Sequence, residues 1–145
     1  MSPSTRPAAA SDRRASKPIA GEDRPNLATI SIAAWLIPGA GHLVQGQPRK
    51  AAIFFVTLIL MFVLGLGFGG RLFPFQLSEP LVLLEAVAEW LLGVPSLIAR
   101  LGGYGQGQIV AATYEYGNTF LIVSGLLNAL VILDAVDLAA GRKPR

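Results

Sequence analysis

Two aspartates near the end of the chain are the clearest candidates for chemistry. Asp134 and Asp137 are one helical turn apart in an apolar stretch. Paired carboxylates can carry protons or act as acid and base, and ionisable groups inside a membrane segment commonly serve a function. Arg142 and Lys143 follow closely, which favours ion pairing or solvation, most of all for Asp137. We therefore regard Asp134 as the stronger functional candidate.

Two further polar side chains lie in apolar surroundings. His42 follows a Pro–Gly break, where it can relay protons or bind a ligand; more often such a histidine satisfies carbonyls that the break leaves free. Asn128 lies deeper in the last apolar stretch and is expected to hydrogen-bond another helix. If His42, Asn128 and Asp134 line one path between helices, the chain is a small transport or proton-conducting unit.

Three glycines imitate a nucleotide-binding motif. Gly65, Gly67 and Gly70 match GxGxxG, but that fingerprint needs a strand before it, and an apolar stretch of helical length precedes it here. We interpret Gly65 and Gly69 as a small-xxx-small pair for close helix packing. The pair Gly125 and Ala129 has the same spacing.

Two glutamates, Glu85 and Glu89, are four residues apart and resemble a glycosidase pair. Nothing around them builds a sugar site, and one helix face does not create a cleft. We expect them on a solvated or intersubunit stripe.

Residue usage excludes several classes of site. The chain has no cysteine and one histidine, so a disulfide, a thiolate metal site and a His-rich metal centre are all excluded. We predict no catalytic set, no metal and no cofactor. Of its 145 residues, 52% are hydrophobic and 14% are charged, against about a quarter charged in soluble domains. The composition is that of an integral membrane protein.

Basic residues gather at the two ends of the chain. Five of the twelve Lys and Arg precede residue 27 and three close the chain, and the interval between Lys50 and Arg142 holds two, Arg71 and Arg100. These charges lie on the predicted tails and not on a folded face, so we predict no nucleic-acid partner. The positive-inside rule explains them better and places both termini in the cytoplasm.

Four apolar segments predict an all-α polytopic membrane domain over 27–145: residues 27–46, 51–70, 80–101 and 119–140. The first is broken at Pro38, Gly39 and Gly41, and the chain should then turn through Gly46–Pro48 into the second. The third carries Glu85, Glu89, Ser96 and Arg100 near one stripe, with Pro95 as a kink, so it either spans the membrane or lies at its interface. Residues 1–26 lack aromatic residues and are predicted to be a disordered tail without an export signal.

Two topologies satisfy the cytoplasmic termini, with 102–118 outside. Either all four segments cross, or the first is a re-entrant hairpin and the third lies on the surface. The basic turn Gln47–Lys50 favours the hairpin, whereas the hydrophobic lengths favour four crossings, which we prefer. A hairpin would bring Asp134 within about 4 Å of His42, Arg49 or Lys50.

A resemblance adds a boundary to this reading. Two parts of the chain resemble an uncharacterised bacterial family of small membrane proteins. The first is the run Trp35–His42, followed by Gly46 and by Arg49 and Lys50 before a span. The second is an ending that carries Gly117, Asn118, Asn128, Asp134, Asp137 and Gly141–Pro144. That family has a WLxPGxGH motif and a GRKP ending, and the match covers 27–144. More distantly, PGAGH…G is similar to the two-helix transmembrane domain family, although Leu43-Val44-Gln45 replaces most of that motif. Neither resemblance implies an activity.

Taken together, the sequence predicts a non-enzymatic multi-pass protein of the cell (inner) membrane. We expect it to act through helix–helix contacts, as a subunit or assembly partner. Its expected partners are the lipid bilayer and other membrane subunits or further copies of itself. The alternative is the transport or proton-conducting unit that uses Asp134, Asn128 and His42.

Overall fold

The computed structural model describes residues 26–142, which form six helices and no named strand. The predicted all-α class is therefore confirmed. The disorder predicted for the tail concerns residues that lie, except for Asn26, outside the described part of the chain. The helices, in chain order, are α1 (Leu27–Leu36), α2 (Ala40–Val44), α3 (Pro48–Gly67), α4 (Pro80–Trp90), α5 (Val94–Leu101) and α6 (Tyr114–Ala139).

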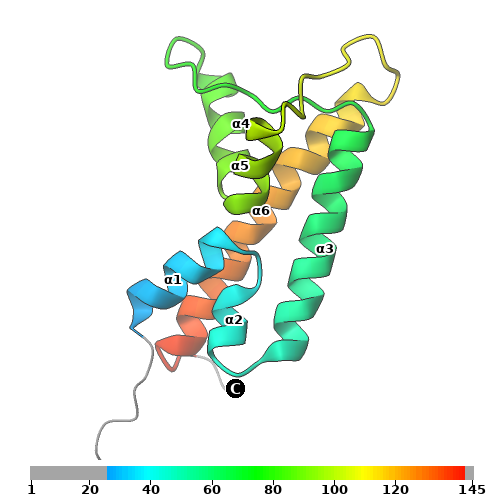
Figure 1. Cartoon of the computed structure of the whole chain (residues 1–145). Helices are drawn as coiled ribbons and strands as arrows, with labels where there is room; N and C mark the ends of the chain where they lie inside the picture. Colours follow the sequence, from blue (N-terminus) through cyan, green and yellow to red (C-terminus); the bar gives the residue numbers. More distant parts are fainter. Residues whose placement is uncertain (1–25, 143–145) are drawn as a thin grey trace, which may run out of the picture.

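Two helices, α3 and α6, are long and apolar enough to cross a membrane (Figure 1). They have 20 and 26 residues, and twenty residues of α-helix rise about 30 Å, the thickness of a hydrocarbon core. The helices predicted over 51–70 and 119–140 are confirmed. The first begins earlier, because Pro48 suits the opening position of a helix, and ends at Gly67.

Close packing of α3 on α6 depends on a glycine. A Cβ added at Gly65 would lie 2.9 Å from the side chain of Leu121, so the missing side chain makes room for that leucine. The predicted packing role of Gly65 is confirmed. The role predicted for Gly69 is wrong: this residue lies in the turn after α3 with φ 82° and faces Gln108. A helix and not a strand precedes the three glycines, as expected.

The first apolar segment is broken where the sequence predicts. Helix α1 ends at Leu36, the short helix α2 follows the Pro–Gly turn, and the chain turns through 45–47 into α3. Ten residues of α1 rise only about 15 Å. Figure 1 shows α1 and α2 at the end of the molecule where α3 begins and α6 ends. The preference for four full crossings is not supported, because the described residues hold at most three candidate spans and α1 is too short to be one of them.

The third segment is bent as well. Helices α4 and α5 meet at 111°, so together they form either a broken span or a re-entrant loop. Gly93, with φ 72° and ψ −128°, supplies the turn, and Pro95 lies in the first turn of α5. In Figure 1 this pair occupies the end opposite to α1 and α2. By length and composition, the described residues thus hold two candidate spans, or three if the bent pair counts as one.

Helix α6 is the common support, since α1, α2, α3 and α4 all pack against it. One buried cluster joins α6 to α3 and α5 through Leu58, Phe62, Ala99 and Leu121, and a smaller one joins it to α1 through Ala34 and Ala135. The outward side of α3 is apolar: Ile53, Val56, Leu60 and Val63 are 55–64% exposed. Such a face is expected of a helix that lies in lipid.

Candidate functional site

The predicted signature turn packs α2 between three other helices. Gly39 has φ 82°, and a Cβ there would lie 2.5 Å from the carbonyl oxygen of Ala51 in α3. A Cβ added at Gly41 would lie 2.8 Å from the Cβ of Ala34 in α1 and 2.9 Å from that of Ala135 in α6. Pro38 is buried in the same turn. These residue types are therefore needed for close backbone approach.

Gly46 has a different role from the other two glycines. It has φ 74° and nothing within 4 Å of an added Cβ. It supplies the left-handed residue of the turn from α2 to α3, and it makes no close contact. The signature turn is therefore built from two packing glycines and one turn glycine.

His42 is aimed at α6 by this packing. Its Nε2 lies 3.0 Å from Oδ2 of Asp134, and the two side chains are 0% and 31% exposed. The ring also lies 5.0 Å from that of Phe54 in α3. This confirms the short distance that the hairpin arrangement predicts. His42 is the basic group that reaches Asp134 among the described residues, whereas Arg49 and Lys50 are exposed.

The expectation that the His42 ring satisfies freed backbone carbonyls is wrong. Its Nε2 meets a carboxylate, and its Nδ1 is buried and has no hydrogen-bond partner in the described part of the chain. Gln45 supplies the backbone link instead: its Nε2 donates to the Ala135 carbonyl at 2.8 Å and to the Gly41 carbonyl at 3.0 Å. Two side chains of the α2 region thus hold it on α6.

Asn128 lies two turns before Ala135 on the same helix, and its predicted bond to another helix is confirmed. Its Nδ2 donates to the Leu91 carbonyl at 2.8 Å and to the Ala34 carbonyl at 3.4 Å. These carbonyls belong to the last turns of α4 and α1, which lack partners within their own helices. Trp35 Nε1 also donates to the Trp90 carbonyl, at 3.1 Å. The two broken segments therefore meet at Asn128.

The predicted polar path is only partly assembled. His42 and Asp134 are brought together, but Asn128 is fully buried against α1 and α4. A cavity of about 640 Å³ between α3 and α6 is lined by Asp134 and Asp137, and neither His42 nor Asn128 lines it. The ion pairing expected for Asp137 is confirmed, since Arg142 Nη1 lies 3.2 Å from its Oδ1.

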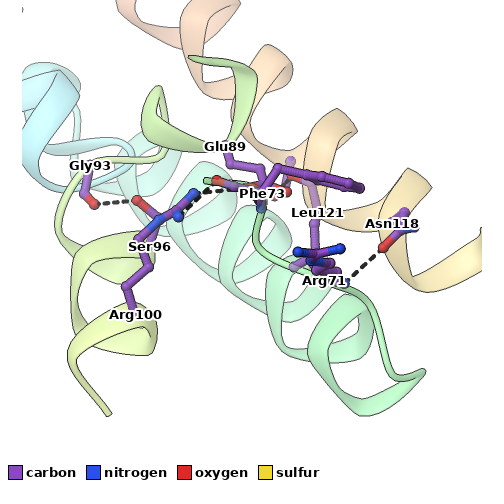
Figure 2. Close-up of polar contacts among 9 residues, drawn as sticks. Arg71, Phe73, Glu89, Gly93, Ser96, Arg100, Asn118 and Leu121 are labelled. Carbon is purple, nitrogen blue, oxygen red and sulfur yellow. Dashed lines mark hydrogen bonds and ion pairs between the residues drawn. The ribbon is translucent and has the colours of Figure 1, made fainter. Parts of the chain in front are cut away.

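A second polar cluster, at the end where α4 and α5 lie, joins residues that the sequence did not pair (Figure 2). Glu89 is 0% exposed, and its Oε2 accepts from Arg100 Nη2 at 2.8 Å and from the Phe73 amide at 2.9 Å. Arg100 Nη1 donates to the Phe73 carbonyl at 2.9 Å. The solvated or intersubunit stripe predicted for Glu89 is therefore wrong.

The bend explains why this pair was missed. Eleven residues separate Glu89 from Arg100, which on a straight helix is about 16 Å. The turn at Gly93 folds α5 back and closes that distance. The sequence did contain one indication of this pair. An acidic and a basic residue occur in the same apolar segment, and charged side chains in such surroundings usually pair.

The site as a whole links helices. The contacts of His42 and Asn128 connect broken segments to α6, and the Glu89–Arg100 pair connects α4 to α5 and to the loop at Phe73. No group of three metal-ligating side chains occurs among residues 26–142. His42 and Asp134 are the pair in which a nitrogen base and a carboxyl group of two helices are in direct hydrogen-bond contact.

Comparison with known proteins agrees with an uncharacterised family. No curated protein and no solved structure matches the chain. The model of a family of unknown function, DUF6677, matches residues 29–144. These are nearly the residues of the membrane domain predicted from the sequence. The chain therefore belongs to the family of unknown function DUF6677.

Proposed function

We propose that the chain is a non-enzymatic multi-pass protein of the cell (inner) membrane that acts through helix–helix contacts, as a subunit or assembly partner of a membrane complex. One observation carries this proposal. Three of its buried polar side chains, His42, Glu89 and Asn128, are engaged in holding its own helices together. What remains for a partner is the apolar outer surface.

That surface is hollowed in several places. Besides the cavity between α3 and α6, a second one of about 740 Å³ lies between α3 and α5 and is lined by Val63, Pro95 and Ile98, among other apolar residues. A partner helix packs well into such a groove, because helix association in lipid depends on close van der Waals contact.

The orientation we propose places both termini in the cytoplasm. Arg49, Lys50 and Arg142 lie at the ends of α3 and α6 that Figure 1 shows together. The positive-inside rule assigns such a cluster to the cytoplasmic side. Residues 68–79 and 102–113 then lie on the outer side.

The alternative, a transport or proton-conducting unit, is favoured by the His42–Asp134 pair and by two broken segments that meet along α6. Broken helices of this kind line the ion sites of many transporters. The separation of Asn128 from the cavity beside Asp134 weighs against it. Asp134→Ala distinguishes the two, because it should abolish conduction but only weaken assembly.

Photo-crosslinking in cells tests the assembly role. In the test variant a crosslinking amino acid replaces Val63, which is 55% exposed and lines the groove between α3 and α5. In the control variant it replaces Leu60, which is 56% exposed on the same helix and does not line that groove. We expect a discrete protein adduct from position 63 and lipid adducts alone from position 60. Lipid adducts alone from both positions would contradict the proposal.

A further inference from the structure

The outer end of the molecule carries an unusual pair of arginines. Arg71 and Arg100 are the two basic residues between Lys50 and Arg142, and both line one cavity of about 270 Å³. They come from different segments, the turn after α3 and the helix α5. The fold thus gathers the basic groups of the apolar part of the chain at one place.

One of these arginines has no hydrogen-bond or ion-pair partner for its guanidinium among the described residues. Arg100 is held by Glu89 and the Phe73 carbonyl. The guanidinium of Arg71 makes no hydrogen bond or ion pair within residues 26–142, and it lies 5.8 Å from the Phe73 ring centroid. Only its backbone amide is engaged, by Asn118 at 2.8 Å (Figure 2). Glu89 can neutralise one arginine, so at least one positive charge is left for a ligand.

The rest of the cavity suits an oxyanion. Tyr104 and Gln106 line it with the two arginines, and each brings a side-chain donor. The loop is fixed beside the arginines, because the Leu72 amide donates to the Gly105 carbonyl at 2.8 Å and Arg71 forms a β-bridge with Gln106. A guanidinium presents a planar fork that matches phosphate oxygens in pairs.

We propose that this cavity, lined by Arg71, Arg100, Tyr104 and Gln106, binds a phosphate-class anion. Two sources share this chemistry: the phosphodiester of a lipid headgroup, and free inorganic phosphate. The cavity lies where α3 and α5 end, at the level at which a bilayer presents its headgroups if these helices cross it. The inference does not depend on the assembly role, because neither arginine lines the groove between α3 and α5, which shares only Tyr104 with this cavity.

The test uses the purified full chain in a phospholipid-free, non-phosphate detergent. One arm titrates a short-chain phosphatidylglycerol, and the other titrates inorganic phosphate, with bound ligand counted by native mass spectrometry. Arg71→Gln should weaken binding about tenfold, the loss expected for one charge-assisted contact. Arg71→Lys should retain part of it. Arg49→Gln removes the same charge at the other end and should leave binding unchanged.

The two arms identify the source. Binding of the phospholipid alone, dependent on Arg71, assigns the site to a headgroup; saturable phosphate binding with the same dependence assigns it to the free anion. Equal binding by the parent chain and Arg71→Gln, or no binding of either probe, would overturn the proposal. Circular dichroism checks folding, and Arg71→Gln should pass because its side chain makes no hydrogen bond with the described residues.

Discussion

His42 Nε2 and Asp134 Oδ2 lie 3.0 Å apart, although 92 residues separate them in the chain. The pair joins the short helix α2 to the last turns of α6, and Arg142 follows just after that helix ends. It therefore places the end of the first apolar segment at the same end of the molecule as the C-terminal part of α6. The Pro–Gly break makes this return possible, and the glycines of the turn let α2 approach closely.

The His42–Asp134 pair should stabilise the fold. We expect a double-mutant cycle with His42→Ala and Asp134→Ala to give a coupling free energy of about 0.5–1.5 kcal/mol, the range for polar contacts between membrane helices. The measurement is unfolding of the purified protein in mixed micelles. The matched cycle uses Asp137→Ala with Arg142→Ala, whose side chains are 36% and 75% exposed, and it should give a smaller coupling because solvent screens the pair. Independent effects of the two mutations at 42 and 134 would remove the structural role of this contact.

Gly41 should tolerate no side chain. Gly41→Ala places a methyl group within 2.9 Å of the Cβ atoms of Ala34 and Ala135, so we expect a loss of about 1–3 kcal/mol of unfolding free energy from overpacking. Gly67→Ala is the control, because its added Cβ meets nothing within 4 Å and it lies in the last turn of α3. That variant should be neutral or slightly stabilising in the same micelle assay. Equal stability of the two variants would show that α2 does not pack as described.

Glu89 should matter far more than Glu85. Glu89→Ala leaves Arg100 and the Phe73 amide without their carboxylate, and breaking a buried pair costs about 3–5 kcal/mol. Glu85→Ala removes a carboxylate four residues earlier on the same helix that makes no side-chain bond within the described residues, so its effect should stay within about 0.5 kcal/mol. Limited proteolysis at the loop 71–79 provides a second readout, because only Glu89→Ala removes the carboxylate that holds the Phe73 amide of that loop. Similar cleavage of both variants would contradict the account of this cluster.

Local features of the sequence predict much of this fold. The charge-free run 51–70 and the long apolar run 119–140 each decide a helix without reference to any other part of the chain. Pro38 and the glycines after it also act locally. Proline lacks the amide hydrogen that a helix needs and glycine weakens a helix, so together they predict the break. A hydrogen bond from Asn128 to another helix could be predicted, because a buried amide needs a hydrogen-bond partner. The sequence did not indicate which carbonyl groups would accept it.

The features of the structure that could not be predicted from the sequence depend on the geometry of turns. The pairing of Glu89 with Arg100 requires the 111° bend between α4 and α5, and a helical stripe drawn over 80–101 assumes a straight axis. Gly69 fits the small-xxx-small spacing with Gly65, but α3 ends two residues before it. The contact of His42 with Asp134 is likewise long-range, and the hydrophobic length of the first segment gives no indication of it.

The central claim is that the first apolar segment returns to the side from which it enters. The chain has no cysteine, so a single introduced cysteine reports its own side of the membrane. We expect Leu77→Cys, at a position 88% exposed in the loop after α3, to react with a membrane-impermeant maleimide in intact cells. Lys50→Cys, at the opposite end of α3, should react only after permeabilisation. Asn26→Cys, at the start of the first segment, should likewise react only after permeabilisation. Labelling of positions 26 and 50 from opposite sides of the membrane would contradict the claim, because the first segment would then cross.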